Sequence, residues 1–266
     1  MTAIPPILLV GLGKMGGAML AGWRERGLAP SVAVDPTLPP SPGPEVIVVA
    51  DAAAIPTGFN PAAIVLAVKP QNAAETLPLY ARFGGSAVML SIMAGRTLAG
   101  MRTLLGEGSS VVRAMPNTPA AVRQGVTVAC PGPGVTAAQR ELCDALLAAI
   151  GSVAWVDDEA LLDPVTAVSG SGPAYVFLLA ELMEQAAIEQ GLPADLARML
   201  ARETVSGSGA LLAASAEDAA QLRKNVTSPG GTTAAAMARE SASGIAALSI
   251  RTDSAAATKR SRELAG

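Results

Sequence analysis

The architecture of this chain follows from a run near its start, Ile7-Leu8-Leu9-Val10-Gly11-Leu12-Gly13-Lys14-Met15-Gly16. A short, continuous apolar segment that ends in glycine is typical of a buried parallel strand. The residues from 15 to 26 have a helical pattern, and Gly27 lies where a left-handed helix cap belongs. Strand, glycine turn and helix in this order predict the first unit of a dinucleotide-binding fold.

Each glycine of this turn has its own expected role. Gly11 permits the tight turn, Gly13 lets the backbone approach a pyrophosphate, and Gly16 allows close contact between helix and strand. Free N–H groups and the positive end of the helix would hold the pyrophosphate. The alternative is a glycine-rich packing turn in an α/β domain that binds no cofactor. The candidate cofactor contacts in the turn are Gly11, Leu12, Gly13, Lys14, Met15 and Gly16.

A carboxylate follows the second expected strand, at Asp35. In dinucleotide-binding folds, an acidic residue at this sequence spacing from the last glycine of the turn, here Gly16, accepts hydrogen bonds from the adenosine ribose. The same carboxylate would repel a 2′-phosphate. No Lys or Arg lies between Arg26 and Lys69. The sequence therefore favours NADH over NADPH. The alternative is that Asp35 only caps a turn before Pro36.

Two further strand ends should line the same crevice, because ligands bind beyond the carboxyl ends of parallel strands. Pro70 and Pro116 lie there, lack an N–H donor and restrict the residue before them to extended conformations. They would present Lys69 and Asn117 to the nicotinamide side of the cleft. The alternative for Lys69 is a solvated surface lysine. The candidate cofactor contacts here are Ala67, Val68, Lys69, Pro70, Met115, Pro116 and Asn117.

Strands and helices alternate over residues 1–160, and helices alone follow over 161–266. Alternation predicts an α/β domain with a doubly wound, mainly parallel, Rossmann-like sheet, here followed by an all-α domain. We therefore expect a domain boundary near residue 160. The expected strands are 7–10, 32–34, 46–49, 64–68, 88–92, 111–115, 126–129 and 153–156, with helices at 72–83, 98–105, 137–150, 175–190, 194–214, 218–225, 232–240 and 245–263.

Several of the later helices carry small and apolar residues nearly all round, with few charges to face water. A single bundle of this length would leave much of that apolar surface uncovered. The helical half is therefore expected to form a homodimer with interlocked subunits.

Two polar, glycine-rich turns open helices in this half. Ser228-Pro229-Gly230-Gly231-Thr232-Thr233 exposes N–H groups beside two hydroxyls, an arrangement that suits a small carboxylate. Ser169-Gly170-Ser171-Gly172-Pro173 could also face a ligand. For both turns the alternative is a structural helix entry. The candidate substrate contacts are Ser171, Asn225, Ser228, Gly230, Gly231, Thr232 and Thr233.

Composition excludes several classes of function. Lys and Arg total 19 against 22 Asp and Glu, so no basic footprint for nucleic acid is present. The chain has no histidine, which excludes a Ser-His-Asp triad, and the spacing of Cys130 and Cys143 matches no metal site. We expect no metal and two reduced thiols in a cytoplasmic protein. The longest apolar runs, such as 145–156, are too short to cross a bilayer, so no membrane is expected.

Together these residues resemble the pyrroline-5-carboxylate reductase family. The resemblance spans nearly the whole chain, through GLGKMGGAM, AVKPQ, SIMAG, RAMPNTPA, AVSGSGPAYVF and NVTSPGGTTAAAM, of which the last two are the most specific. It implies NAD(P)H-dependent reduction of 1-pyrroline-5-carboxylate to L-proline. It also implies a 6-phosphogluconate-dehydrogenase-like fold whose helical domain interlocks into dimers that can assemble further.

The resemblance also assigns roles to residues. It implies cofactor contacts at Ala94 and Gly95. It also implies a substrate site at the Ser228–Thr233 turn, in which the Thr233 hydroxyl lies nearest the substrate ring. Thr233 and Lys69 are the candidate catalytic residues. An iminium already accepts hydride well, so a chain without histidine needs no powerful general acid.

This sequence departs from the family's pattern at two places. Many members carry a His-Pro pair where this chain has Asp218-Ala219, and many place Ser, Asn or Arg where it has Asp35. Two other functions compete with the reductase. A β-hydroxyacid dehydrogenase relies on a lysine early in its second domain, and the helix after Pro173 has none. A non-catalytic dinucleotide sensor would leave the Ser228–Thr233 turn unexplained.

Overall fold

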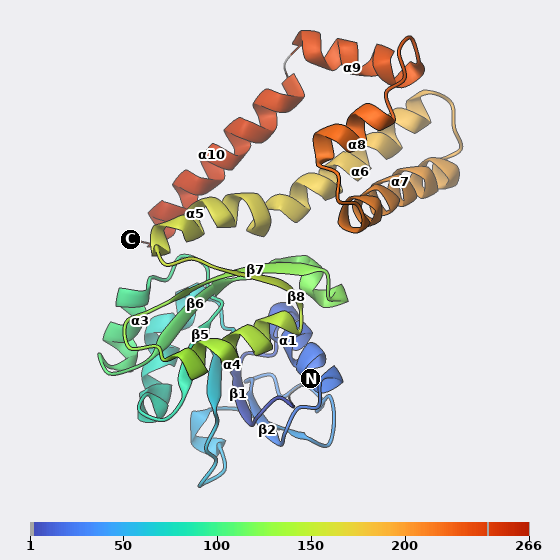
Figure 1. The fold of residues 1–266 in the computed structure, drawn as a ribbon. Coiled ribbons are helices and arrows are strands. Elements are labelled where there is room, and N and C mark those ends of the chain that lie inside the picture. The colour runs from blue at the N-terminus through green and yellow to red at the C-terminus, as the bar shows by residue number, and fades with distance from the viewer. Residues whose placement is uncertain (1–2, 244, 266) are drawn as a thin grey trace. The chain divides into compact units, whose positions relative to one another are not determined.

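The computed structural model describes residues 3–243 and 245–265, with side chains over 3–238 and 254–264. It divides into two compact units, one of Met1–Ser171 with Ala257–Gly266 and one of Gly172–Ala256. We call them the sheet unit and the helical unit. In Figure 1 all labelled strands belong to the first, and α6 to α9 belong to the second. The domain boundary near residue 160 stays a prediction.

One eight-stranded sheet organises the sheet unit, in the order β3-β2-β1-β4-β5-β6-β7-β8. All neighbouring pairs are parallel except β6 and β7, which are antiparallel. The expected doubly wound, mainly parallel sheet is confirmed. The strands are β1 Ile7–Val10, β2 Ser31–Val34, β3 Val46–Val49, β4 Ala63–Leu66, β5 Val88–Ser91, β6 Val111–Met115, β7 Gly125–Pro131 and β8 Gly151–Trp155.

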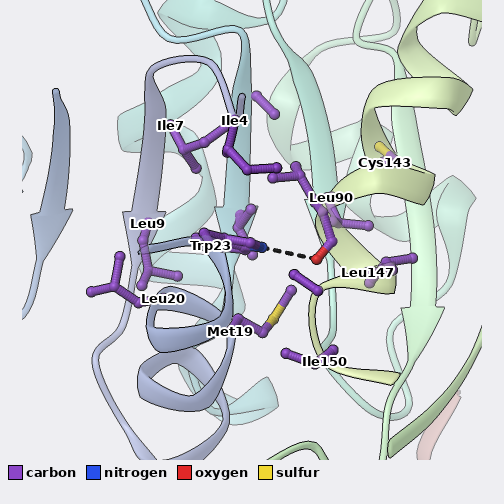
Figure 2. Packing of buried hydrophobic residues seen from close by; sticks show 14 of the residues in the cluster. Ile4, Ile7, Leu9, Met19, Leu20, Trp23, Leu90, Cys143, Leu147 and Ile150 are labelled. Atoms are coloured by element: carbon purple, nitrogen blue, oxygen red, sulfur yellow. Dashed lines mark hydrogen bonds between the residues drawn. The ribbon is translucent and has the colours of Figure 1, made fainter. Parts of the chain in front are cut away.

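Strand β1 is apolar at every residue because both of its faces are buried. Successive side chains of a strand point to opposite faces, and here Ile7 and Leu9 enter one hydrophobic cluster while Leu8 and Val10 enter another. Figure 2 shows part of the first cluster, in which the Trp23 indole N–H donates a hydrogen bond to the Leu146 carbonyl at 2.9 Å. Burial on both faces is what a parallel sheet covered by helices requires.

Helices α1 Lys14–Glu25, α3 Leu98–Leu105 and α4 Ala137–Ala148 connect the strands, as expected. Gly27 has a φ of +78°, the left-handed cap predicted for the end of α1. The single helix expected over 72–83 is wrong. Its residues form the short helix α2, Ala73–Thr76, between the 3₁₀ turns Pro70–Asn72 and Leu77–Phe83. Pro78 lacks the N–H that a continuous α-helix would use at that point.

The remaining helices follow β8. They are α5 Leu162–Val165, α6 Gly172–Glu189, α7 Ala194–Ala214, α8 Ala219–Asn225, α9 Thr232–Ser243 and α10 Ile245–Ala265. The last part of α10 belongs to the sheet unit. There the Ser261 hydroxyl donates a hydrogen bond to the Asp163 carboxylate at 2.7 Å.

The expectation that no segment could reach across a bilayer is corrected. The turns after residue 158 run into α6 as one helical stretch, Glu159–Glu189, of 31 residues, whose most apolar 18-residue window has a mean hydropathy of 1.3. Small polar residues within this stretch interrupt its apolar runs but not its helix, so counting apolar runs missed it. Length and composition alone would let it span a membrane, and only 6% of its most apolar window is buried. A single such helix is weak evidence, because helices that pack in protein interiors pass the same test.

Candidate active site

A cavity of about 410 Å³ lies at the carboxyl ends of strands β4 to β6 and the start of α1. Strand β1 has β2 on one side and β4 on the other, so the strand order reverses here. In open α/β sheets this is where ligands bind, and the volume lies in the range of ligand cavities. Its lining residues are Gly13, Lys14, Met15, Ala67, Val68, Lys69, Ile92, Met115, Pro116, Asn117, Thr118 and Gly170.

The three glycines of the first turn meet different surroundings. A Cβ on Gly11 would lie 2.7 Å from the Ala67 carbonyl oxygen, and one on Gly16 would lie 2.1 Å from the Gly11 carbonyl oxygen. Gly11 also has a φ of +99°, which side chains disfavour. A Cβ on Gly13 would meet nothing within 4 Å. The loop is therefore tightly packed at Gly11 and Gly16 and open at Gly13. A loop whose backbone amides bind a dinucleotide pyrophosphate requires this arrangement.

Asp35 braces this loop from the end of β2. Its carboxylate accepts the Leu12 N–H at 2.8 Å, and also the Thr37 N–H at 2.9 Å and the Thr37 hydroxyl at 2.6 Å. Burial raises the pKa of this carboxyl, but the hydrogen bonds from Thr37 and Leu12 outweigh burial and hold the pKa below its ordinary value of 3.8. The turn-capping alternative is thus present in the structure. Asp35 does not line the cavity, and its contact with a ribose stays a prediction.

The polar side chains of the cavity suit an anionic ligand. Lys14 and Lys69 are both exposed and both line it, and none of its lining residues in the described part of the chain is acidic. The Asn117 side chain is buried, and its amide oxygen accepts the Val126 N–H at 2.9 Å. That bond fixes the orientation of the side chain, so its NH₂ is the group left to offer to a ligand.

The structure gathers part of the expected cofactor set. Gly13, Lys14, Met15, Ala67, Val68, Lys69, Met115, Pro116 and Asn117 line the cavity. Gly11, Leu12, Gly16, Asp35, Pro70, Ala94 and Gly95 do not. A Cβ on Gly95 would lie 2.9 Å from Cβ of Leu264, so this glycine meets the end of α10.

Sequence reasoning missed three lining residues, Ile92, Thr118 and Gly170. Ile92 directly follows β5, so the rule that ligands meet strand ends could have found it. Thr118 belongs to the motif that follows β6. Gly170 precedes the expected contact Ser171, whose own N–H donates to the Thr166 carbonyl at 2.9 Å.

The Ser228–Thr233 turn lies in the helical unit and opens α9. Gly230 has a φ of +74°, and the Gly231 N–H donates to the Ser228 carbonyl at 3.0 Å. Helix α9 begins at Thr232, so the N–H groups of Thr232 and Thr233 belong to the first turn, which has no partner within the helix. The turn therefore offers amides and hydroxyls to an anion.

Asn225 is engaged locally. Its side-chain NH₂ donates to the Glu217 carboxylate at 2.9 Å, and its oxygen accepts from Gln221 at 2.7 Å. A substrate contact at Asn225 would have to replace or share these hydrogen bonds.

The cysteines have surroundings unsuited to nucleophilic chemistry. Cys130 and Cys143 are free and buried, and burial raises the pKa of Cys143 to about 12. A thiol reacts as its thiolate, so Cys143 is inert near neutral pH. Among the residues that the structure describes, no group of three or more His, Cys, Asp or Glu could hold a metal ion.

Comparisons with known proteins place this geometry in a family. Residues 159–264 match the family model described as pyrroline-5-carboxylate reductase dimerisation. The chain is 38% identical to the pyrroline-5-carboxylate reductase of Pseudomonas aeruginosa, over 98% of this chain and 97% of that protein. It is 36% identical to that of Mycobacterium tuberculosis, over 97% and 96%.

Solved structures agree. The pyrroline-5-carboxylate reductase of Coxiella burnetii superposes with a TM-score of 0.87 at 30% identity, covering 98% of both chains. The pyrroline carboxylate reductase of Plasmodium falciparum, solved with NADP bound, superposes with a TM-score of 0.83 at 26% identity, over 98% of this chain and 99% of that one. The chain therefore belongs to the pyrroline-5-carboxylate reductase family.

Proposed function

We propose that this chain carries out its family's reaction, the NAD(P)H-dependent reduction of 1-pyrroline-5-carboxylate to L-proline, as the closing step of proline biosynthesis in the cytoplasm. The observation that carries the proposal is the likeness to the Pseudomonas aeruginosa enzyme over 98% of the chain. It includes both the cavity of the sheet unit and the Ser228–Thr233 turn, each of which supplies a different part of the chemistry.

The residues of the sheet unit would hold the cofactor. The Gly11–Gly16 loop would bind the pyrophosphate with its amides, and Lys69, Met115 and Asn117 would contact the nicotinamide side. Bound there, NAD(P)H supplies the hydride. Lys69 would add positive charge beside the reacting groups, and no acidic side chain is found among the described residues of the cavity wall to oppose that charge.

The residues of the helical unit would hold the substrate. Amides of the Ser228–Thr233 turn bind the substrate carboxylate, and the Thr233 hydroxyl hydrogen-bonds the ring nitrogen or passes it a proton from water. A cyclic imine is basic enough to be partly protonated in neutral water, so a hydroxyl is sufficient. Holding both reactants in position is then the main source of rate, and the two sites must meet in the working enzyme.

NADH is the proposed preferred cofactor. A carboxyl group whose pKa lies below 3.8 is fully ionised at neutral pH, so Asp35 carries a negative charge there and would repel a 2′-phosphate. The sequence has no Lys or Arg between Arg26 and Lys69 that could hold this phosphate. Asp35 would instead accept hydrogen bonds from the ribose hydroxyls, in addition to the Leu12 N–H.

The proposed working form is a homodimer. Helix α6 contains no buried residue in the single chain, and Phe177 is 65% exposed. Such apolar surface is too extensive for a water-facing helix. It belongs to residues 159–264, which match the family's dimerisation model, so a second copy of the chain is the natural cover.

A steady-state assay with 1-pyrroline-5-carboxylate and each reduced cofactor in turn tests this function. We expect proline to form with both cofactors and a higher kcat/KM with NADH. The control replaces the substrate with a 3-hydroxy acid and oxidised cofactor, on which a β-hydroxyacid dehydrogenase would act. Cofactor binding without turnover of either substrate would overturn the proposal in favour of a dinucleotide sensor.

A further inference from the structure

Gly170 lies in the cavity wall at the end of a π-helical turn, Thr166–Gly170. The turn closes when the Ser171 N–H donates to the Thr166 carbonyl at 2.9 Å, five residues earlier. The Thr166 and Ser169 hydroxyls donate to carbonyls four residues before them, at 2.7 and 2.9 Å. Such wide turns are rare and are frequently found at functional sites. This one ends at the residue that borders the cavity.

A side chain at Gly170 would collide with Met115, which lines the same cavity. A Cβ there would lie 2.8 Å from the Met115 methyl group, whereas ordinary contact begins at 3.4 Å. The next nearest atom, the Thr166 methyl, would be at 3.5 Å. The methyl group is the far end of a flexible side chain, so Met115 would move rather than the backbone. Gly170 is also absent from the residues with positive φ, so alanine is allowed there.

We propose that Gly170 is a specificity-determining residue that sets how far Met115 reaches into the cavity, and thereby the room for the nicotinamide ring. Met115 ends β6, two residues before Asn117, on the side that the proposed function assigns to the nicotinamide. The inference therefore rests on that function. A residue without a side chain at position 170 lets the methyl group withdraw, and a larger residue pushes it toward the ring.

The test compares two ligands that differ only in the nicotinamide. The dissociation constant of NADH is measured from the fluorescence of the bound reduced nicotinamide, and that of ADP-ribose by its competition with NADH. Both are measured for the wild type, Gly170→Ala, Met115→Ala and the double variant. Gly172→Ala is the matched control, because a Cβ there would meet nothing within 4 Å. The melting temperature of each variant checks its folding.

Overpacking by one methyl group costs enough to change affinity measurably. We expect Gly170→Ala to raise the dissociation constant of NADH about tenfold, which is about 1.4 kcal/mol, and to leave that of ADP-ribose unchanged. In the Met115→Ala background, Gly170→Ala should have no further effect, because the methyl group that it displaces is gone. The Gly172→Ala control should match the wild type.

Three results would overturn the inference. They are unchanged NADH binding by Gly170→Ala, an equal loss of ADP-ribose binding, and an undiminished effect in the Met115→Ala background. If Gly170→Ala does not fold, Met115→Ala alone decides: it must change the dissociation constant of NADH and leave that of ADP-ribose unchanged. A wild type that binds neither NADH nor NADPH would overturn both this inference and the proposed function, whereas normal NADH binding by Gly170→Ala would overturn this inference alone.

Discussion

Alanine substitution at Gly16 should destabilise the protein, whereas the same substitution at Gly13 should weaken cofactor binding and leave stability unchanged. The two glycines belong to one loop and differ in what a methyl group would meet. At Gly16 the new Cβ would lie 2.1 Å from the Gly11 carbonyl oxygen, more than an ångström inside ordinary contact. At Gly13 it would meet nothing within 4 Å, and the φ of −64° there is one that alanine adopts freely.

The size of the effect at Gly16 follows from the atoms that it displaces. Overpacking costs about 1–3 kcal/mol, and the upper end applies because the obstructing atoms are backbone atoms that cannot rotate away. A loss of about 3 kcal/mol lowers the melting temperature of a unit of this size by about 6–12 °C. At Gly13 the methyl group would occupy the path of the pyrophosphate, so we expect the dissociation constant of NADH to rise at least about tenfold, at about 1.4 kcal/mol.

Thermal unfolding followed by circular dichroism and NADH titration together measure both effects. Each variant is the control for the other, because both add one methyl group to the same loop. Equal melting temperatures for the two variants would show that the loop is not packed as described. A normal NADH affinity for Gly13→Ala would show that the pyrophosphate does not approach the backbone at that residue.

The other expectations concern Thr233, Asp35 and the subunit contact. Thr233→Val should lower kcat roughly 10²-fold, with Thr233→Ser, which keeps the hydroxyl, as the control, and wild-type turnover by Thr233→Val would remove Thr233 from the mechanism. Asp35→Ser should raise kcat/KM for NADPH relative to kcat/KM for NADH. Loss of the Leu12 hydrogen bond affects both cofactors alike, so it cancels in this ratio. An unchanged ratio would contradict the role of Asp35 in cofactor choice. The pKa of Asp35 is lowered by folding, so its contribution to stability is present above its ordinary pKa of 3.8 and is lost as the pH falls below it. The melting temperatures of wild type and Asp35→Ser should therefore converge below pH 3.8. Light scattering at micromolar concentration should give the mass of a dimer. A monomeric mass would contradict the proposal that a second copy of the chain covers α6.

Local sequence patterns predicted most elements of the fold. The run Ile7–Val10 is a strand because its side chains alternate between two buried clusters. Helix α7 begins and ends at the residues that the helical pattern of the sequence predicted. The helix over 72–83 failed because helical periodicity outweighed Pro78 in the prediction. The long helical stretch Glu159–Glu189 was missed because backbone hydrogen bonding continues through small polar residues that end an apolar run.

The sequence by itself determined the strand, glycine turn and helix of the cofactor loop, since the positive φ of Gly11 and the close contact of Gly16 with the Gly11 carbonyl arise within the loop itself. It also marked the strand-end residues Lys69 and Asn117, because parallel strands present their carboxyl ends at one edge. Only the tertiary structure showed that Gly170 meets the Met115 methyl group and that Asp35 holds the Leu12 amide. Contacts such as these join residues far apart in the chain, and their geometry is set by how elements pack, which no local pattern encodes.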